Sequence, residues 1–274
     1  MIGPAVIELA FDPVIHLGAL EVRAQTVLLA LILLTGLLLA ARIGHLTPQP
    51  GPYVPPPPLR PDDIPFLVLG VVPGAVIGGR IEYVLVHLDY YLANPAAIAD
   101  PGQGSLGLGL AVAGGTLGAI AIARLIGAPA GRWMHAAVLP VLFLLAGGKL
   151  ASTLAGEGQG LPSDLPWATS YSGPGPWASL APTVASHPSQ VYEAVATTLV
   201  IIVIALGLRM GAFGRRNGAA LLGGILLWGF ARGMVAFTWR DAPIAGPFLA
   251  AQLVLVAVIG GCLVGLLRLY RARG

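Results

Sequence analysis

The sequence predicts an all-α integral membrane protein with seven transmembrane helices, an N-terminus outside the cell and a C-terminus in the cytoplasm. The first observation is composition, because 56% of the 274 residues are hydrophobic and only 10% are charged, whereas a soluble domain has about 25% charged residues. The second is that the apolar residues gather in runs of about 20, the length of a spanning helix, without the alternation of a barrel strand. The third is the distribution of arginines between these runs, which orients the chain.

Seven apolar segments form one predicted transmembrane domain over residues 1–274. They cover roughly residues 26–43, 64–87, 106–127, 133–155, 189–210, 219–238 and 247–269. The third and fourth segments are rich in glycine and alanine, which is typical of tightly packed membrane helices. The sequence contains no convincing internal repeat, which argues against a transporter built from repeated halves.

Basic residues outside the segments fall almost entirely on one predicted side of the membrane. The N-terminus and the stretches after segments two, four and six hold only Arg23 and Arg240. The stretches after segments one, three, five and seven hold Arg42, Arg60, Arg124, Arg132, Arg209, Arg215, Arg216, Arg268, Arg271 and Arg273. Because arginine-rich loops stay in the cytoplasm, this bias reports topology, and we expect no binding of nucleic acid.

Three stretches lie outside the predicted membrane. Residues 1–25 form an outer-surface segment that we expect to lie at the interface as a short element, with Asp12 capping a turn. Residues 44–63 form a cytoplasmic connector, extended because Pro55 to Pro58 are a run of four prolines. Residues 156–188 form an extracytoplasmic loop or cap, because the stretch is too long for a plain turn.

Polar residues inside the apolar segments mark a candidate site. Each charged side chain in hydrocarbon costs roughly 2.5–3.5 kcal/mol on insertion scales, yet Arg80 and Glu82 lie two residues apart in segment two. With a helical rise of about 1.5 Å per residue, the predicted topology brings polar residues from four segments to a similar depth near the outer leaflet. They are Arg80, Glu82, Lys149, Glu157, His187, Gln190, Glu193 and Arg232.

Such a cluster suits a phosphate group, because arginine and lysine both bind phosphate oxygens. A phospholipid is the anionic ligand always present at that depth. Four glycines would leave room for a lipid between helices: Gly78, Gly79, Gly114 and Gly115. The alternative is that the charges are structural ion pairs with no ligand. Those pairs would be Arg80 with Glu82, Lys149 with Glu157, and Arg232 with Glu193.

The histidines give no indication of a metal site. They stand at positions 16, 45, 87, 135 and 187, scattered and without the spacing of metal ligands. We therefore expect no metal and no soluble cofactor. For His187, a satisfied interfacial histidine and a catalytic one both remain open.

Two motifs resemble the prolipoprotein diacylglyceryl transferase family. Residues 78–85 read Gly-Gly-Arg-Ile-Glu-Tyr-Val-Leu, similar to the family's Gly-Gly-Arg-Ile-Gly-Tyr-Val-Leu. Residues 187–193 read His-Pro-Ser-Gln-Val-Tyr-Glu, similar to its Arg-His-Pro-Ser-Gln-Leu-Tyr-Glu. Residues 11–14, Arg232 and Gln252 also resemble family positions, so the resemblance covers most of the chain. The family is likewise seven-helical with an outside N-terminus.

The resemblance implies a transferase of the bacterial cytoplasmic (inner) membrane. The family moves diacylglyceryl from phosphatidylglycerol to the lipobox cysteine thiol of a preprolipoprotein at the outer leaflet, and glycerol phosphate leaves. The implied catalytic residues are Arg80 and Arg232 as a phosphate clamp, with Glu157 and His187, the latter a hypothetical base. The implied substrate-binding residues are Gly79, Glu82, Gly114, Gly115, Lys149, Ser189, Gln190, Tyr192 and Glu193.

Several polar positions of the family pattern are replaced. Ala113 stands where the family has a histidine before two glycines, and Lys149 stands where it has an arginine. The replaced asparagines include one at Ser152, Gln25 takes the place of a tyrosine, and Ala236 that of a glutamate. Two accounts stay open: a working transferase with rearranged groups, or a divergent phospholipid-binding relative with another substrate or none. A transporter or channel is disfavoured, because the inner halves of the segments are apolar.

Overall fold

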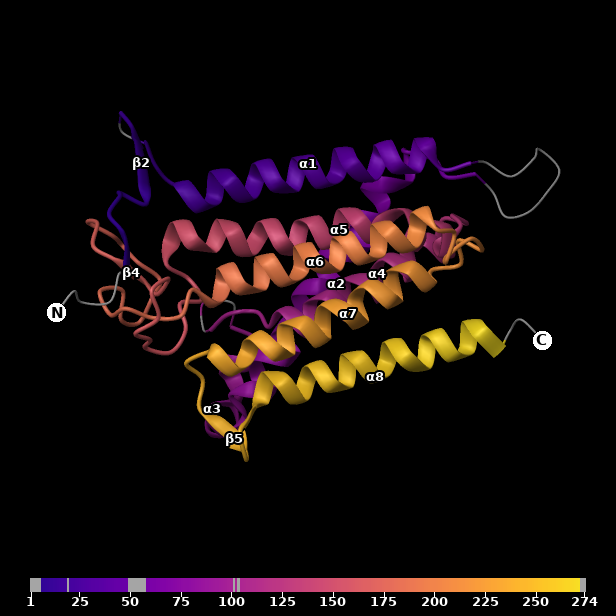
Figure 1. The fold of residues 1–274 in the computed structure, drawn as a ribbon. Coiled ribbons are helices and arrows are strands. Elements are labelled where there is room, and N and C mark those ends of the chain that lie inside the picture. The colour runs from indigo at the N-terminus through magenta and orange to yellow at the C-terminus, as the bar shows by residue number, and fades with distance from the viewer. Residues whose placement is uncertain (1–5, 19, 49–57, 101, 103, 272–274) are drawn as a thin grey trace.

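A computed structural model describes residues 6–18, 20–48, 58–100, 102 and 104–271, and within them seven helices are long and apolar enough to cross a membrane. These helices are α1 (Ala24–Leu46), α2 (Asp63–Val86), α4 (Leu108–Leu125), α5 (Ala130–Ser152), α6 (Ser189–Arg209), α7 (Ala219–Val235) and α8 (Ala250–Arg271). They lie side by side as one elongated bundle (Figure 1). The predicted all-α class and the seven spans are therefore confirmed. Most of the proline-rich run in residues 44–63 lies outside the described residues.

Short elements gather at one end of the bundle, the end where α1 begins (Figure 1). They are α3 (Leu88–Ala93), the 3₁₀ turns η1 (Pro95–Ile98), η2 (Thr153–Ala155) and η3 (Ala236–Thr238), and the strands β1 (Ile7–Leu9), β2 (Val14–Leu17), β3 (Leu20–Arg23), β4 (Thr169–Tyr171), β5 (Pro243–Ala245) and β6 (Phe248–Leu249). The strands form three two-stranded sheets, β1–β4 parallel, β2–β3 antiparallel and β5–β6 antiparallel. These small sheets were not expected from the sequence.

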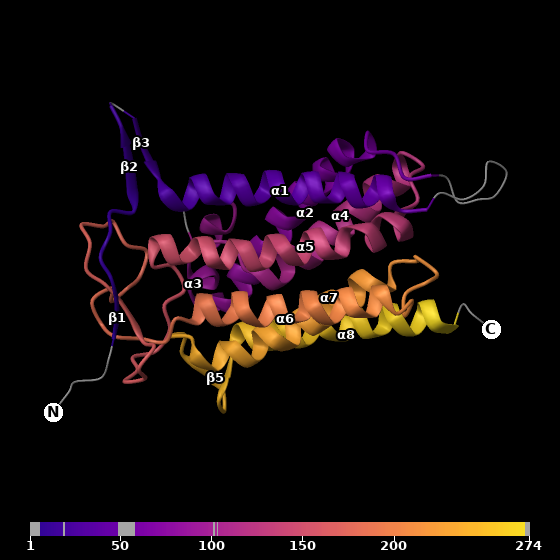
Figure 2. The ribbon, with the colours of Figure 1, turned by 45° about the horizontal axis from the view of Figure 1, so that its top comes forward.

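The N-terminal segment is built into the structure at the end of the bundle where α1 begins. Strand β1 pairs with β4 of the loop over residues 156–188, and the β2–β3 hairpin projects beside it (Figure 2). Asp12 caps a turn as expected, since its Oδ1 accepts a hydrogen bond of 2.8 Å from the backbone N–H of Val14. The segment therefore fastens the 156–188 loop to the bundle.

Helices α2 and α4 pack backbone against backbone. Their facing glycines recur every four residues, at Gly70, Gly74 and Gly78 on α2 and at Gly114 and Gly118 on α4. A Cβ at Gly114 would collide with the carbonyl of Gly74, and one at Gly118 with that of Gly70. Small residues at this spacing allow such close approach.

The glycines do not hold space for a lipid, and that expectation was wrong. Gly78 and Gly114 face each other across the α2–α4 contact, and Gly115 lies against Val71 and Ala75. The carbonyl of Gly79 accepts a 2.8 Å hydrogen bond from the N–H of Gly107. The space left by the missing side chains is therefore filled by the neighbouring helix.

The apolar core lies among α5, α6, α7 and α8. Its most buried members include Val138 and Leu142 on α5, Ile204 on α6, Trp228 on α7 and Leu255 on α8, each at most 2% exposed. Helix α1 packs on α5, where Gly147 lies against Ile32. The core holds α5, α6 and α7 in contact, and these three helices carry the charged residues described below.

Gly118→Ala should lower the stability of the folded protein by about 1–3 kcal/mol, because overpacking a close contact forces the backbones apart. Gly261→Ala on α8 is the matched control, since a Cβ there meets no atom within 4 Å. Alanine favours helix over glycine, so the control should be unchanged or slightly stabilised. Thermal unfolding in detergent micelles, followed by circular dichroism, compares the two. Equal melting temperatures would contradict the backbone contact.

Candidate active site

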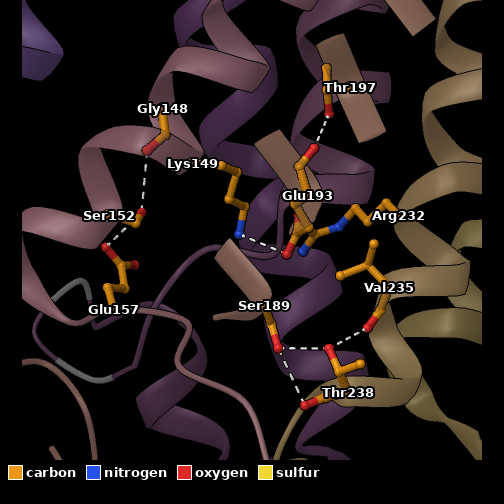
Figure 3. A network of polar contacts seen from close by, with 10 residues as sticks. All are labelled: Gly148, Lys149, Ser152, Glu157, Ser189, Glu193, Thr197, Arg232, Val235 and Thr238. Atoms are coloured by element: carbon orange, nitrogen blue, oxygen red, sulfur yellow. Dashed lines mark hydrogen bonds and ion pairs between the residues drawn. The ribbon is translucent and has the colours of Figure 1, made fainter. Parts of the chain in front are cut away.

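One buried carboxylate bridges two cations from different helices. Glu193 on α6 is 4% exposed, and its Oε1 lies 3.2 Å from Nζ of Lys149 on α5. Its Oε2 accepts a hydrogen bond from Nη1 of Arg232 on α7 (Figure 3). The expected pair of Arg232 with Glu193 is present, whereas Lys149 pairs with Glu193 and not with Glu157. We call Lys149, Glu193 and Arg232 the charge triad.

By formal charges, with both cations protonated, the charge triad has one positive charge in excess. Two cations share one carboxylate, and buried charges are stable only when they are paired and well hydrogen-bonded. The guanidinium of Arg232 also lies over the ring of Trp239, 4.5 Å from its centroid, and 5.9 Å from that of Trp228. The remaining positive charge is therefore held in place and can attract an anion.

Two members of the charge triad, Lys149 and Arg232, border a cavity of about 340 Å³. One part of its wall is polar and another is apolar, which suits an amphipathic ligand. The polar wall includes Lys149, Arg232, Glu82, Glu157 and Ser152. The apolar wall includes Val86, Leu106, Leu108, Leu144 and Leu145, and the remaining lining residues are Tyr83, Gly107, Gly148 and Ala251.

Glu82 enters the cavity wall from α2, and a helix end stabilises its carboxylate. It is 3% exposed, and its Oε2 accepts a 2.6 Å hydrogen bond from the backbone N–H of Leu110 in the first turn of α4. A helix N-terminus favours a negative charge. Gly107 is required beside it, because a Cβ there would collide with the Glu82 side chain.

Arg80 does not line this cavity, and its expected pairing with Glu82 was wrong. Residues two apart on an α-helix point about 200° apart around its axis. Arg80 instead donates to three backbone carbonyls after α3, those of Ala97 (2.5 Å), Ile98 (2.8 Å) and Asp100 (3.0 Å). Of the two arginines of the expected phosphate clamp, only Arg232 is among the residues that line this cavity. Arg80 fastens the segment between α3 and α4 onto α2.

Glu157 lies at the exposed edge of the cavity, just past the end of α5. Its Oε2 accepts a hydrogen bond of 2.7 Å from Nε2 of Gln25 on α1 and one of 3.4 Å from Oγ of Ser152. Sequence reasoning treated Gln25 and Ser152 only as replaced polar groups. Both orient the same carboxylate, and no sequence signal joins positions 25 and 157.

The His-Pro-Ser-Gln motif secures the start of α6. The backbone of His187 bonds that of Gly160 and Leu161, at 2.8 and 2.9 Å, and its Nδ1 lies 3.4 Å from the Tyr192 hydroxyl. Oγ of Ser189 lies 2.6 Å from Oγ1 of Thr238 after α7. The motif therefore sets the position of Glu193, which follows on α6.

Gln190 and Tyr192 connect the same motif to the 156–188 loop. Nε2 of Gln190 donates to the hydroxyl of Tyr171 (3.0 Å), and the Tyr192 hydroxyl accepts from Nε1 of Trp167 (2.7 Å). Burial raises the pKa of the Tyr171 hydroxyl, against a smaller lowering by the Gln190 amide, so this phenol stays neutral. In the described part of the chain, His187, Ser189, Gln190 and Tyr192 are not among the cavity-lining residues.

The remaining replaced positions have no acid–base group. Ala113 packs against the apolar core, and Ala236 is completely buried. Gln252 on α8 accepts from the N–H of Leu249 and donates to the carbonyl of Gly233, both at 2.8 Å. Gln252 therefore ties α8 to α7 and is not among the residues that line the cavity.

The seven spans and the cavity define an integral membrane protein with a hollow lined by both charged and apolar residues. Comparison with known proteins gives the family. The family model for prolipoprotein diacylglyceryl transferase matches residues 13–268. The chain therefore belongs to this family, as its motifs led us to expect.

Three relatives illustrate the similarity, each named phosphatidylglycerol–prolipoprotein diacylglyceryl transferase. The protein from Ruegeria pomeroyi is 36% identical over 218 residues, which cover 73% of this chain and 70% of the relative. That from Geobacter sulfurreducens is 32% identical over 209 residues, covering 72% and 74%. That from Allorhizobium ampelinum is 32% identical over 228 residues, covering 80% and 74%.

Glu193→Gln should destabilise the protein by about 3–5 kcal/mol, because it leaves the buried Arg232 and the partly exposed Lys149 without their shared partner. Lys149→Met in the same chain should restore part of the loss, since it removes one of these cations. The measurement is unfolding in mixed micelles with increasing denaturing detergent. Glu157→Gln is the control, because this exposed carboxamide should change stability by no more than about 0.5 kcal/mol. Strictly additive effects of the two triad substitutions would contradict the shared ion pair.

Proposed function

We propose that this protein transfers the diacylglyceryl group of phosphatidylglycerol to the cysteine thiol of a lipobox-containing preprolipoprotein. The observation that carries the proposal is the charge triad, which presents one net positive charge to a cavity with an adjoining apolar wall. A phosphodiester with acyl chains requires both features. Family membership supports the same reaction.

The reaction exchanges a carbon–oxygen bond for a carbon–sulfur bond. The thiolate sulfur attacks the glyceryl carbon attached to the phosphate, and the bond from that carbon to the phosphate oxygen breaks. The electron pair of the broken bond stays on that oxygen, so glycerol phosphate leaves as an anion. Lys149 and Arg232 stabilise the charge that develops there, and Glu193 holds both cations in position.

The thiol must lose its proton, because the thiolate is the nucleophile. We assign this role to Glu157, whose carboxylate borders the cavity and is oriented by Gln25 and Ser152. His187 was the earlier hypothesis for the base, but its ring contacts Tyr192 and lies outside the cavity lining. Arg80 acts as a positioning residue. It holds the segment that precedes α4, and the first turn of α4 donates the hydrogen bond that Glu82 accepts.

The topology inferred from the arginines supports an outer-leaflet site in the bacterial inner membrane. Lys149 and Arg232 lie in the last turn of α5 and α7, and both helices run toward the side with few arginines outside the spans. Phosphatidylglycerol would enter from that leaflet, and the lipobox cysteine from the extracytoplasmic side.

A second candidate is a relative that binds phospholipid without this turnover. The position where the family has a histidine is Ala113, which packs against apolar core residues and cannot exchange a proton. A protein of this kind would retain phosphatidylglycerol through the charge triad. Bound lipid without transfer would favour it.

Lys149→Met and Arg232→Ala should each lower the turnover number about 10²- to 10³-fold, the usual effect of removing one group that stabilises developing negative charge. The measurement is transfer of radiolabelled diacylglyceryl from phosphatidylglycerol to a lipobox peptide in reconstituted vesicles. Lys149→Arg is the matched control, because it keeps the charge and should retain most activity. Wild-type protein that transfers nothing but carries phosphatidylglycerol would contradict the enzyme and support the second candidate.

Glu157→Gln should slow transfer about 10²- to 10⁴-fold at neutral pH, the range of a general base. The activity of this variant should recover as the pH rises past about 8.5, where the cysteine thiol ionises unaided. The pH–rate profile measures both effects. His187→Ala is the comparison and should keep the wild-type profile. The reverse result, with His187→Ala inactive and Glu157→Gln unchanged, would restore His187 as the base.

A further inference from the structure

A second hollow lies at the opposite end of the bundle from the charged cavity. It has a volume of about 600 Å³ and is bounded by the connection between α6 and α7 and by the last turns of α8. We call it the α8 groove. Its apolar wall includes Phe213 from the connection and Leu263, Leu266 and Leu267 from α8. This end of α8 lies beside the α6–α7 connection, far from the strands (Figure 1).

The α8 groove is a basic site. Arg215 lines it and is exposed, and within the described part of the chain its guanidinium forms no ion pair. Arg271 follows the lining residues Leu267 and Tyr270 on α8 and falls at the edge of their helical face. Residues 194–240 and 242–274 contain no aspartate or glutamate. A negatively charged group would therefore meet only cations on the elements that form the groove.

The apolar wall belongs to a membrane-spanning helix. Leu263 is 47% exposed and Leu267 is 55% exposed on α8, so this face is open to the hydrocarbon of the bilayer. Tyr270, which lies one turn beyond, is a residue type enriched at the membrane–water interface. An occupant must therefore have an anionic group at the interface and an apolar chain along α8. A phospholipid with an acidic headgroup has both, and it reaches the groove from within the membrane.

The groove is separate from the charged cavity. Ala219 at the start of α7 lines the groove, and Arg232 lines the cavity thirteen residues later. At about 1.5 Å per residue the two sites are about 20 Å apart along α7. They therefore face opposite leaflets, and one lipid cannot occupy both.

We propose that the α8 groove binds one anionic phospholipid in the leaflet opposite to the charged cavity, with its phosphate at Arg215 and an acyl chain along Leu263 and Leu267. The site is independent of the transfer reaction and holds whether or not the chain is catalytic. A lipid bound there would fill the space between the α6–α7 connection and α8 and so hold these two elements together.

The test is native mass spectrometry of the detergent-solubilised protein, titrated with dioleoyl phosphatidylglycerol or dioleoyl phosphatidylcholine. Wild-type protein should retain two phosphatidylglycerol molecules. Arg232→Ala should lose the one in the cavity, and Arg215→Gln should bind the other about fivefold more weakly, the effect of about 1 kcal/mol per basic residue near a lipid surface. Arg215→Gln should keep wild-type transfer activity, because it leaves the cavity intact.

Arg268→Gln is the matched control. Arg268 lies on the same turn of α8 as the lining residues Leu267 and Tyr270 but does not itself line the groove. Its loss should therefore leave both lipids bound. Three results would overturn the proposal: Arg215→Gln binding like wild type, Arg268→Gln weakening binding as much as Arg215→Gln, or phosphatidylcholine binding as tightly as phosphatidylglycerol. Because Arg215 is exposed, its substitution should fold normally, and an unchanged melting temperature checks this.

Discussion

The arrangement of the site depends on one shared carboxylate. Glu193 holds Lys149 from α5 and Arg232 from α7, so a single buried side chain joins three membrane-spanning helices. In an apolar environment neither cation is stable alone, and one carboxylate cannot neutralise both. The place of the remaining positive charge is set by the fold, because hydrogen bonds at the start of α6 fix the position of Glu193 one turn further along the helix. Ser189 reaches Thr238 and Gln190 reaches Tyr171, which link that turn to α7 and to the 156–188 loop.

A second constraint places negative charge on the other side of the cavity. The glycines of α2 and α4 bring these helices into backbone contact, and this contact sets Glu82 against the first turn of α4. The helix end stabilises the carboxylate without a basic side chain. Arg80 is then available for the carbonyls after α3, which it holds against α2. Two charged residues that are neighbours in sequence thus serve opposite sides of one helix.

The seven spans could be predicted from the sequence because an apolar segment of about 20 residues is as long as the hydrocarbon core of a membrane is thick. The pair of Arg232 with Glu193 followed from depth, since Glu193 near the start of α6 and Arg232 near the end of α7 both lie at the same end of the bundle. Depth could not select the partner of Lys149: both Glu157 and Glu193 were predicted near it, and only the side-chain geometry shows that Glu193 is the partner. The expected pair of Arg80 with Glu82 could have been excluded from the sequence, because residues two apart on an α-helix point in nearly opposite directions. Gln25 and Glu157 are 132 residues apart in the sequence, and no local sequence pattern predicts their contact.

The charges around the cavity also determine how a phospholipid would lie in it. Glu82 and Glu157 border the cavity together with the two cations. A phosphate is repelled by both carboxylates and attracted by Lys149 and Arg232, so its low-energy position is against the charge triad. The acyl chains would then lie along the apolar wall, and a glyceryl carbon next to the phosphate would be open to attack from the side where Glu157 lies. A thiol arriving from that direction would approach the carbon on the side away from the leaving phosphate, which is the geometry that displacement at carbon requires. Such an orientation needs no histidine, and it explains how a chain with Ala113 could still perform the reaction.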